Sequence, residues 1–305
     1  MAKEPTPCTI VGQGAVGSFL TFYLSQPSCK LNVVTRQGLT EVIHFIDTQK
    51  VSVDLHPQPY NFDVEISNLL LPTKAYDIHS AFKHLQPKLA NNANIILFNN
   101  GMGCIEEITP LLGPKQRLLA ASVTHGVLKQ ASNVIHTGQG AIYYGDVTPN
   151  KKSDPLSADT LADCDTMLKH LPNCQKVKNI EYRLWQKLAI NACINPITAL
   201  NQQQNRSVLD KHYYELINDI LNEFCQITHA IHLDFDFNTL LSTVLEVAKA
   251  TGENFSSMNR DVYNKRRTEI DYINGYIVKK GQELAIKTPV NQQLVAQVKN
   301  VENRV

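Results

Sequence analysis

The sequence predicts an α/β fold made of two domains, an N-terminal Rossmann dinucleotide-binding domain and a C-terminal all-helical domain. In the first half, short apolar strands alternate with helical patterns, which is typical of βαβ units around a parallel sheet. A glycine-rich turn follows the first of these strands. From about Glu181 onward, apolar residues recur every three or four positions without a convincing strand. We therefore expect domains at residues 1–176 and 177–305.

The individual elements follow from apolar runs and their period. The strands of the first domain fall at residues 9–11, 31–35, 69–71, 94–98 and 118–123, with helical periodicity at 18–24 and 78–89. The stretch VIHTGQGAIYYGD at 134–146 predicts an antiparallel hairpin, because β-branched and aromatic residues surround a glycine-containing turn. A polar loop at 148–159 and a short helix at 161–171 follow. The second half predicts helices at 213–231, 238–250 and 270–285.

The composition is that of a soluble globular protein, with 43% hydrophobic and 19% charged residues. A net charge of +1 argues against a nucleic-acid-binding protein, which usually carries a basic excess. The seven cysteines include no CxxC pair, so we expect neither a disulfide framework nor a metal site. No stretch has the ~20 apolar residues of a membrane span, and the start lacks a signal-peptide core. We expect a cytoplasmic protein without a membrane partner.

A phosphate-binding turn is indicated by TIVGQGAVGSFL, in which Gly12, Gly14 and Gly17 form a G-x-G-x-x-G pattern after a strand. The first glycine permits the tight turn, the second lets the backbone approach a pyrophosphate, and the third lets helix pack on strand. The alternative is a purely structural turn. The predicted cofactor contacts in this loop are Gly12, Gln13, Gly14, Ala15, Val16 and Gly17.

The end of the second strand indicates which dinucleotide is bound. An acidic residue there would bind the ribose diol of NAD, whereas an arginine accommodates the 2′-phosphate of NADP. The sequence reads NVVTRQG, with Arg36 after the strand and no Asp or Glu between Leu31 and Gly38. We therefore expect NADPH as the cofactor; the alternative is an arginine that is merely exposed after a strand.

A line of polar residues crosses an otherwise apolar helix in WQKLAINACINPITAL. Lys187, Asn191 and Asn195 recur at steps of four, so they lie on one helical face. The flanking Leu, Ile, Ala and Cys residues predict burial nearly all round. Buried polar groups need partners, so we expect a polar ligand beside this face. The alternative is a lysine whose head group reaches water from a core helix.

Several fragments taken together resemble the ketopantoate reductase family (2-dehydropantoate 2-reductases). They are GQGAVG, VVTRQG, PTKAYD, LFNNGMGCIEEI, THG, VIHTGQG, WQKLAINACINPITAL, FSSMNRDV and RRTEIDYINGYIV. The resemblance runs from about residue 8 to about residue 295. It implies a Rossmann domain, a helical domain similar to the C-terminal domain of 6-phosphogluconate dehydrogenase, and an active site in the cleft between them. It also implies NADPH-dependent reduction of ketopantoate to pantoate, on the way to pantothenate and coenzyme A.

The resemblance further implies roles for individual residues. Lys187 matches the general acid, and Asn191 and Asn195 match residues that bind substrate polar groups. Glu269 matches an active-site glutamate that bonds the substrate hydroxyl, and Ser257 matches a serine that contacts the substrate carboxylate. On one continuous helix Ser257 and Glu269 would lie about 18 Å apart. We therefore expect a helix break near Arg267 and Thr268, with Thr268 as a cap.

Two further positions match the family's cofactor region. Asn100 in FNNGMG corresponds to an asparagine beside substrate and nicotinamide, and Lys74 in PTKAYD to a lysine near the cofactor, although an exposed loop lysine is the alternative. His125 and His136 also match family positions, but a structural hydrogen bond is the simpler interpretation of both.

The sequence thus predicts an NADPH-dependent reductase whose partner is a small molecule, ketopantoate, in a monomer or homodimer. One rival is a reductase of another small 2-keto or 3-hydroxy acid, because pocket residues that discriminate similar acids are not identified by sequence. Another is a non-catalytic NADP-binding sensor, in which we would expect one or more of the catalytic residues to be replaced.

Overall fold

The computed structural model describes residues 5–149 and 155–303 of the chain. Backbone contacts divide it into two units. The N-terminal unit comprises Met1–Asn99 and Cys104–Glu181, and the helical unit comprises Asn100–Gly103 and Tyr182–Val305. The short segment 100–103 therefore belongs with the helices, although a strand of the N-terminal unit precedes it.

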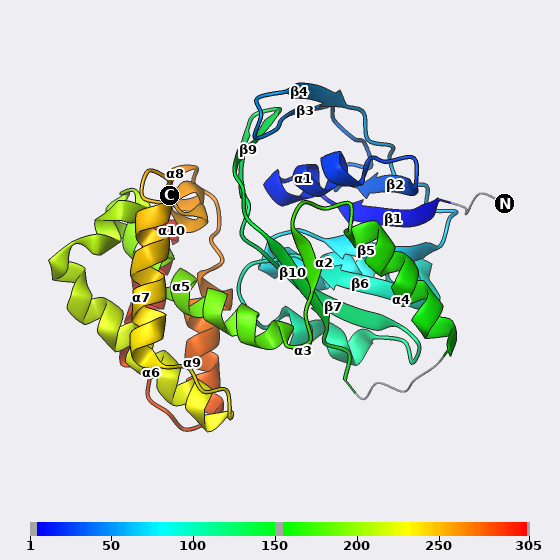
Figure 1. The fold of residues 1–305 in the computed structure, drawn as a ribbon. Helices are drawn as coiled ribbons and strands as arrows, with labels where there is room; N and C mark the ends of the chain where they lie inside the picture. Colours follow the sequence, from blue (N-terminus) through cyan, green and yellow to red (C-terminus); the bar gives the residue numbers. More distant parts are fainter. Residues whose placement is uncertain (1–4, 150–154, 304–305) are drawn as a thin grey trace. The chain divides into compact units, whose positions relative to one another are not determined.

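The N-terminal unit is built on a seven-stranded sheet (Figure 1) with the order β11-β10-β7-β6-β5-β1-β2. Its strands are β1 (Thr6–Val11), β2 (Cys29–Val34), β5 (Ile66–Leu71), β6 (Leu89–Leu97), β7 (Arg117–Val123), β10 (Ile142–Asp146) and β11 (Cys174–Lys176). The five strands from β2 to β7 are parallel, and β10 runs antiparallel to β7. All five predicted strands are therefore confirmed. Continuous apolar runs such as Leu69–Leu71 suit strands that are covered on both faces.

Helices of this unit follow the strands, as in a doubly wound fold. They are α1 (Ala15–Leu24), α2 (Ala75–Leu85), α3 (Cys104–Ile108) and α4 (Pro155–Leu168), with 3₁₀ turns η1 (Gln86–Lys88) and η2 (Thr109–Leu111). The predicted loop at 148–159 is wrong at its end, because α4 begins at Pro155, a residue that suits the first turn of a helix. Residues 150–154 of that predicted loop lie outside the described residues.

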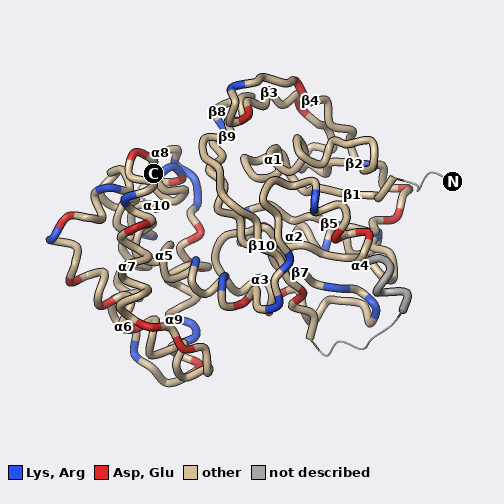
Figure 2. The backbone as a smooth tube through the Cα atoms, in the orientation of Figure 1, with Lys and Arg blue, Asp and Glu red and all other residues tan. Residues whose placement is uncertain are grey.

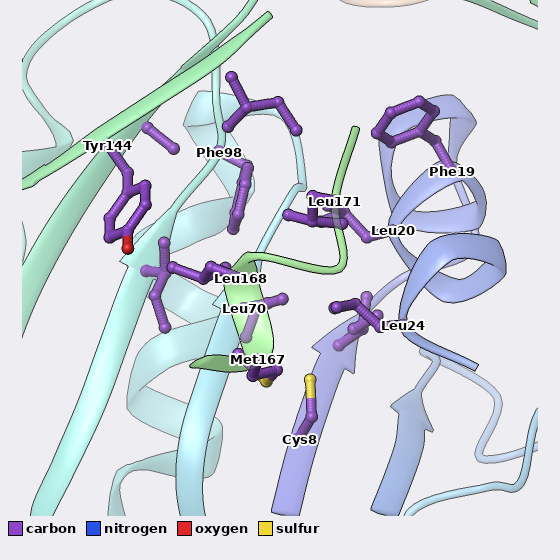
Figure 3. Packing of buried hydrophobic residues seen from close by; sticks show 14 of the residues in the cluster. Cys8, Phe19, Leu20, Leu24, Leu70, Phe98, Tyr144, Met167, Leu168 and Leu171 are labelled. Atoms are coloured by element: carbon purple, nitrogen blue, oxygen red, sulfur yellow. The ribbon is translucent and has the colours of Figure 1, made fainter. Parts of the chain in front are cut away.

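The core of the N-terminal unit joins α1 and α4 to the sheet. Figure 3 shows Phe19, Leu20 and Leu24 of α1 near Leu70 of β5 and Leu168 of α4, and all five side chains are buried. Each fully buried Leu or Phe side chain contributes about 1.5–3 kcal/mol of transfer free energy. This packing holds the start of α1 at the carboxyl end of β1, where the glycine turn lies.

A second, four-stranded sheet has the order β4-β3-β9-β8. Its strands are β3 (Ile43–Ile46), β4 (Ser52–Leu55), β8 (Gly126–Gln130) and β9 (Asn133–Gly138). The predicted hairpin at 134–146 is therefore wrong, since β9 pairs with β8 and β10 joins the large sheet. Gly140 lies in the segment that passes from β9 to β10, packed against the backbone of Thr124. A Cβ on Gly140 would approach the Thr124 carbonyl carbon to 2.4 Å. The true turn contains Ala131, with φ of 52°, instead of the glycine that would have signalled it.

The helical unit confirms the all-helical prediction within the described residues. Its helices are α5 (Ile180–Asn201), α6 (Tyr214–Ala230), α7 (Phe237–Ala250), α8 (Ser257–Tyr263), α9 (Asn274–Glu283) and α10 (Pro289–Asn303). Three 3₁₀ turns lie between them, η3 (Asn205–Leu209), η4 (Lys211–Tyr213) and η5 (Ile270–Tyr272). The N-cap side chains of α7 and α8 bond the helix backbone, since Asp236 accepts from Thr239 N and Ser256 accepts from Asn259 N.

The predicted break between Ser257 and Glu269 is confirmed, but it comes earlier than expected. Helix α8 ends at Tyr263, and Lys265 adopts a left-handed conformation with φ of 55°. Arg266 N then donates to Asp261 O, and Lys265 N donates to Val262 O, which together form a Schellman motif. Thr268 caps the following turn, because its Oγ1 accepts from Ile270 N at 3.2 Å.

The predicted helix 270–285 is interrupted. Ile273 has φ of −109° and ψ of −95°, so the 3₁₀ turn η5 ends and α9 starts at the next residue.

Positive and negative residues are interspersed along the backbone of each unit (Figure 2). In the described part of the chain, no helix combines the length and apolar character required to cross a bilayer.

Candidate active site

The glycine loop connects β1 to α1 with the geometry that a dinucleotide phosphate requires. Gly12 has φ of 88°, a left-handed conformation that favours glycine. A Cβ on Gly17 would lie 2.2 Å from Gly12 O, whereas a Cβ on Gly14 would meet nothing within 4 Å. Gly14 is also the N-cap of α1, and no side chain caps that helix. The loop therefore leaves open space at Gly14 before a helix start that no described side chain caps, and these two features together favour an anion.

A pocket of about 330 Å³ adjoins this loop. It is lined by residues from β1, from the end of β2 and from α2, including Gly12, Arg36, Thr73, Asp77 and His84. The Oγ1 atom of Thr73 is buried and has no hydrogen-bond partner among the described residues. A buried hydroxyl without a partner costs about 1–3 kcal/mol, so a polar ligand in the pocket would relieve that cost. These residues fit a dinucleotide.

Arg36 pairs with an acidic side chain from another element, which the sequence around β2 does not indicate. Its Nη2 atom lies 2.7 Å from Asp77 Oδ2, and the arginine side chain is 84% exposed. Asp77 comes from the first turn of α2. The pocket therefore offers both the cation that suits a 2′-phosphate and a carboxylate of the kind that binds a ribose diol.

Other residues near the loop hold its backbone or line its surroundings. The Gln13 amide bonds the Glu41 backbone twice, donating to its O at 2.8 Å and accepting from its N at 3.0 Å. Lys129 of β8 donates to Gln13 O. Ala15 and Val16 begin α1, and Lys74 is the N-cap of α2, directly after Thr73. Sequence patterns had not identified Thr73, Asp77 or Lys129, because each lies outside the loop motif.

Helix α5 carries the line of polar residues, and its apolar faces are buried as predicted, including Leu188, Ala189, Ala192 and Cys193. Lys187 and Asn191 are half-buried, and Asn195 is buried. Burial lowers the pKa of Lys187 to about 8, and the Glu269 carboxylate acts in the opposite direction. Glu269 is only 3% exposed. The buried carboxylate of Glu269, from a distant part of the chain, thus acts on the charge of Lys187.

Ser257 is the exposed first residue of α8, whereas its neighbour Ser256 is buried. The Ser256 hydroxyl lies 2.8 Å from Thr198 Oγ1 of α5, and it also caps α8. This contact fixes the start of α8, and therefore Ser257, against the helix that carries Lys187.

Asn100 lies in the segment 100–103 of the helical unit, where glycines allow close packing. Gly101 has φ of 75°, and a Cβ there would lie 2.4 Å from Tyr272 O. Met102 N donates to the same carbonyl at 2.8 Å. The segment with Asn100 therefore packs on the turn that follows Glu269. All predicted substrate and catalytic residues belong to the helical unit, and the glycine loop, Arg36 and Lys74 belong to the N-terminal unit.

His125 and His136 form a hydrogen-bonded chain in the N-terminal unit. His125 Nε2 faces Pro172 O at 3.1 Å and must donate, and His125 Nδ1 accepts from Gly140 N. His136 Nε2 lies 3.0 Å from His125 Nδ1, and His136 Nδ1 lies 3.1 Å from the Tyr23 hydroxyl. Burial lowers the pKa of both histidines. The hydrogen bonds agree with the structural interpretation of both histidines, which stays a prediction. Within the described residues no cluster of His, Cys, Asp and Glu could hold a metal ion.

Comparison with known proteins identifies the family. The family model described as ketopantoate reductase PanE/ApbA matches residues 8–149, and its C-terminal model matches residues 179–302. The 2-dehydropantoate 2-reductase of Vibrio cholerae is 32% identical over 96% of this chain and 97% of its own length. A solved structure of the probable 2-dehydropantoate 2-reductase of Bacillus subtilis is 26% identical with a TM-score of 0.77, covering 97% of this chain and 99% of that one.

A more distant solved structure confirms the fold. D-mandelate dehydrogenase in complex with NADH and anilino(oxo)acetate has a TM-score of 0.87 at 21% identity, covering 98% of this chain and 99% of that one. The two family models together cover most of the sequence, from the glycine loop to the last helix. The chain therefore belongs to the ketopantoate reductase family.

Proposed function

We propose that this protein reduces 2-dehydropantoate (ketopantoate) to (R)-pantoate with NADPH, a step towards pantothenate and coenzyme A. The observation that carries the proposal is the desolvated ammonium of the half-buried Lys187, whose pKa of about 8, held up by the charge of Glu269, leaves it protonated at neutral pH. A general acid works best when its pKa lies near the operating pH. Family membership then favours ketopantoate as the substrate.

In this proposal residues 1–176 bind the cofactor, and residues 177–305 with Asn100 bind the substrate. Gly12, Gln13, Gly14, Ala15, Val16 and Gly17 bind the pyrophosphate, with Arg36 on the 2′-phosphate, and Lys74 and Asn100 also contact the cofactor. When bound, the cofactor supplies a hydride to the ketone carbon. Lys187 stabilises the developing charge on the ketone oxygen and donates a proton to it.

The remaining residues orient the substrate. Glu269 accepts a hydrogen bond from the substrate hydroxyl and keeps the ammonium of Lys187 charged by its own negative charge. Asn191 and Asn195 bind the polar groups of the substrate along the α5 face, and Ser257 binds its carboxylate. A cytoplasmic location suits the seven cysteines, which are all free thiols in the structure.

The test follows NADPH absorbance after ketopantoate is added to the purified protein. NADH and 2-ketoisovalerate, which lacks the hydroxymethyl group, serve as comparisons. We expect rapid oxidation of NADPH with ketopantoate and slow turnover of the analogue, because the analogue leaves the hydroxyl-binding groups unpaired. Binding of NADPH without turnover of ketopantoate would contradict the proposed substrate and would direct the search to other 2-keto acids. If no 2-keto acid is turned over, the sensor alternative is favoured.

A further inference from the structure

Helix α5 contains a proline that removes one of its own hydrogen bonds. Pro196 lies inside the helix, which continues to Asn201. In an α-helix the N–H of each residue donates to the carbonyl four residues earlier, and proline has no N–H. The carbonyl of Ala192 therefore loses its intrahelical donor, one residue after Asn191 and three before Asn195.

A side chain from another helix supplies the missing donor. Asn274 Nδ2, at the start of α9, donates to Ala192 O at 3.0 Å, and Asn274 is 0% exposed. A buried carbonyl without a donor would cost about 1–3 kcal/mol. The bond satisfies that group and fastens α9 to α5 at the level of the two asparagines.

Two further buried residues dictate which way the Asn274 amide points. The Glu223 carboxylate accepts from Val290 N at 2.7 Å and from Asn291 N at 3.0 Å, at the start of α10. It also accepts from Asn291 Nδ2 at 2.7 Å. Because a carboxylate only accepts, Asn291 must turn its NH₂ group to Glu223 and its oxygen to Asn274.

Asn274 must in turn present its NH₂ group. It donates to Asn291 Oδ1 at 2.9 Å, and its second hydrogen goes to Ala192 O. The orientation of the Asn274 amide thus follows from the acceptor-only carboxylate of Glu223, a residue that is 6% exposed. The chain of bonds delivers a donor to the one helical carbonyl that Pro196 leaves without one.

The segment that carries Asn274 also carries Glu269, the residue that acts on the charge of Lys187. We propose that Asn274 is a positioning residue, which replaces the hydrogen bond that Pro196 removes and thereby fixes the Glu269 segment against the helix that carries Lys187. The inference rests on the proposed role of Lys187 as general acid. A role in stability alone would leave the titration of Lys187 unchanged.

The primary variant is Asn274→Ala. Truncation frees the Glu269 segment to move, so the Glu269 charge that raises the pKa of Lys187 acts on it less and this pKa falls below about 8. We expect kcat to fall about tenfold while the Kd of NADPH changes less than about twofold, and the alkaline limb of the pH profile to move to lower pH. Asn68→Ala is the matched control, since it removes a buried amide of the N-terminal sheet that donates to Pro7 O.

The decisive variant is Pro196→Ala, which restores an N–H that can donate to Ala192 O. In that background the loss of Asn274 should cost less, so the effects of the two substitutions on kcat should not be additive. Equal effects of Asn274→Ala with and without Pro196 would overturn the proposal. So would a fall in Tm with no movement of the pH profile.

A second, isosteric variant covers the case in which Asn274→Ala does not fold. Glu223→Gln keeps the volume but can donate as well as accept, so the orientation of Asn291 and Asn274 is no longer dictated. We expect the same downward shift of the Lys187 pKa, only smaller. The pKa of Lys187 is also read directly by NMR of ¹³C-labelled lysine, with Lys187→Ala to assign the signal. A downward shift of the Lys187 pKa without any turnover of ketopantoate would uphold the positioning role while rejecting the proposed function. No shift in an active enzyme would reject the positioning role alone.

Discussion

At the scale of single residues, the charge state of Lys187 is the central feature. Its ammonium is desolvated, which lowers its pKa to about 8, and the buried carboxylate of Glu269 limits that effect. A lysine in this setting loses its proton under mildly alkaline conditions, whereas an exposed lysine does so near pH 10.4. With Lys187 as the proposed proton donor, we expect the rate of the reaction to depend on pH in this range.

Replacement of Lys187 by Ala should lower kcat by about 10²–10⁴ through the loss of acid catalysis. In the wild-type enzyme kcat should decline as pH rises through about 8, because the ammonium that donates the proton disappears. Steady-state rates with saturating NADPH and ketopantoate between pH 6 and 10 measure both effects. An alkaline limb that persists in the Lys187 variant would assign the decline to another group.

Asp77 and Arg36 should act in opposite directions on cofactor choice. Arg36→Ala should weaken NADPH more than NADH, because only NADPH carries the 2′-phosphate. Asp77→Asn removes a negative charge beside the arginine, so it should strengthen NADPH about two- to fivefold, in keeping with ~0.2–1 kcal/mol for an exposed ion pair. Fluorescence titration with both cofactors measures this. Equal changes for NADPH and NADH would place the 2′-phosphate elsewhere.

The histidine pair should make the N-terminal unit sensitive to acid. The folded-state pKa of both histidines lies below the ordinary value of 6.5, mainly through burial. The unfolded chain therefore binds more protons as pH falls through 6.5, and stability is lost as pH approaches the folded-state values. His136 also faces Tyr23 and the charge of Asp47. Urea unfolding at pH 7.5 and 5.5 should show a smaller pH effect in His136→Gln; an equal effect would assign the acid sensitivity to other groups.

At the scale of elements, the segment from Ser257 to Glu269 shows how one helix end shapes the site. The Schellman motif at Lys265 and the cap by Thr268 separate α8 from the turn that carries Glu269. The segment can therefore present Ser257 and Glu269 at different places along α5. Hydrophobic periodicity alone would have extended the helices, because a lysine at the left-handed position gives no glycine signal.

Gly101→Ala tests the packing of segment 100–103 on Tyr272. Positive φ costs about 1–2 kcal/mol for alanine, and the contact at 2.4 Å adds about 1–3 kcal/mol of overpacking. Gly38→Ala is the matched control, since Gly38 has φ of 72° but open space around its Cβ. Chemical denaturation should show a loss at Gly101 larger by about 1–3 kcal/mol. Equal losses in the free energy of unfolding at the two glycines would mean that segment 100–103 shifts to accept the Cβ without strain.

At the scale of the whole molecule, the functions proposed for this chain are divided between its two units. The glycine loop and the pocket with Thr73 belong to the N-terminal unit, while Lys187 and Glu269 belong to the helical unit. A ligand that binds only the folded N-terminal unit should stabilise that unit by mass action. Calorimetric unfolding with and without the cofactor therefore indicates which unit binds it.

NADPH at about 100 times its Kd should add about 2.7 kcal/mol to the free energy of unfolding of the unit that binds it. Hydrogen exchange should locate the protection at residues 12–17 and in α2. The Arg36→Ala variant, at the same NADPH concentration, should show a smaller stabilisation. Protection confined to α6 and α7 would contradict the assignment of the cofactor to the N-terminal unit.

The sequence by itself determined the two-part architecture, the five parallel strands, the glycine loop and the polar line on α5. These features are local, because they depend on the spacing of residues within one element. The family was also recognisable, since short motifs along the chain keep their order. The hairpin at 134–146 was wrong, because Ala131 forms the real turn and gives no signal in the sequence.

Only the tertiary structure placed Asp77 beside Arg36, let the charge of Glu269 act on Lys187, and set Asn274 on the carbonyl that Pro196 leaves without a donor. The partners in each pair are far apart in the chain, so no local pattern connects them. Their effects also depend on burial, which lowers the pKa of one lysine and makes one missing hydrogen bond costly. The sequence determined which groups are present, and the fold decided which of them meet away from water.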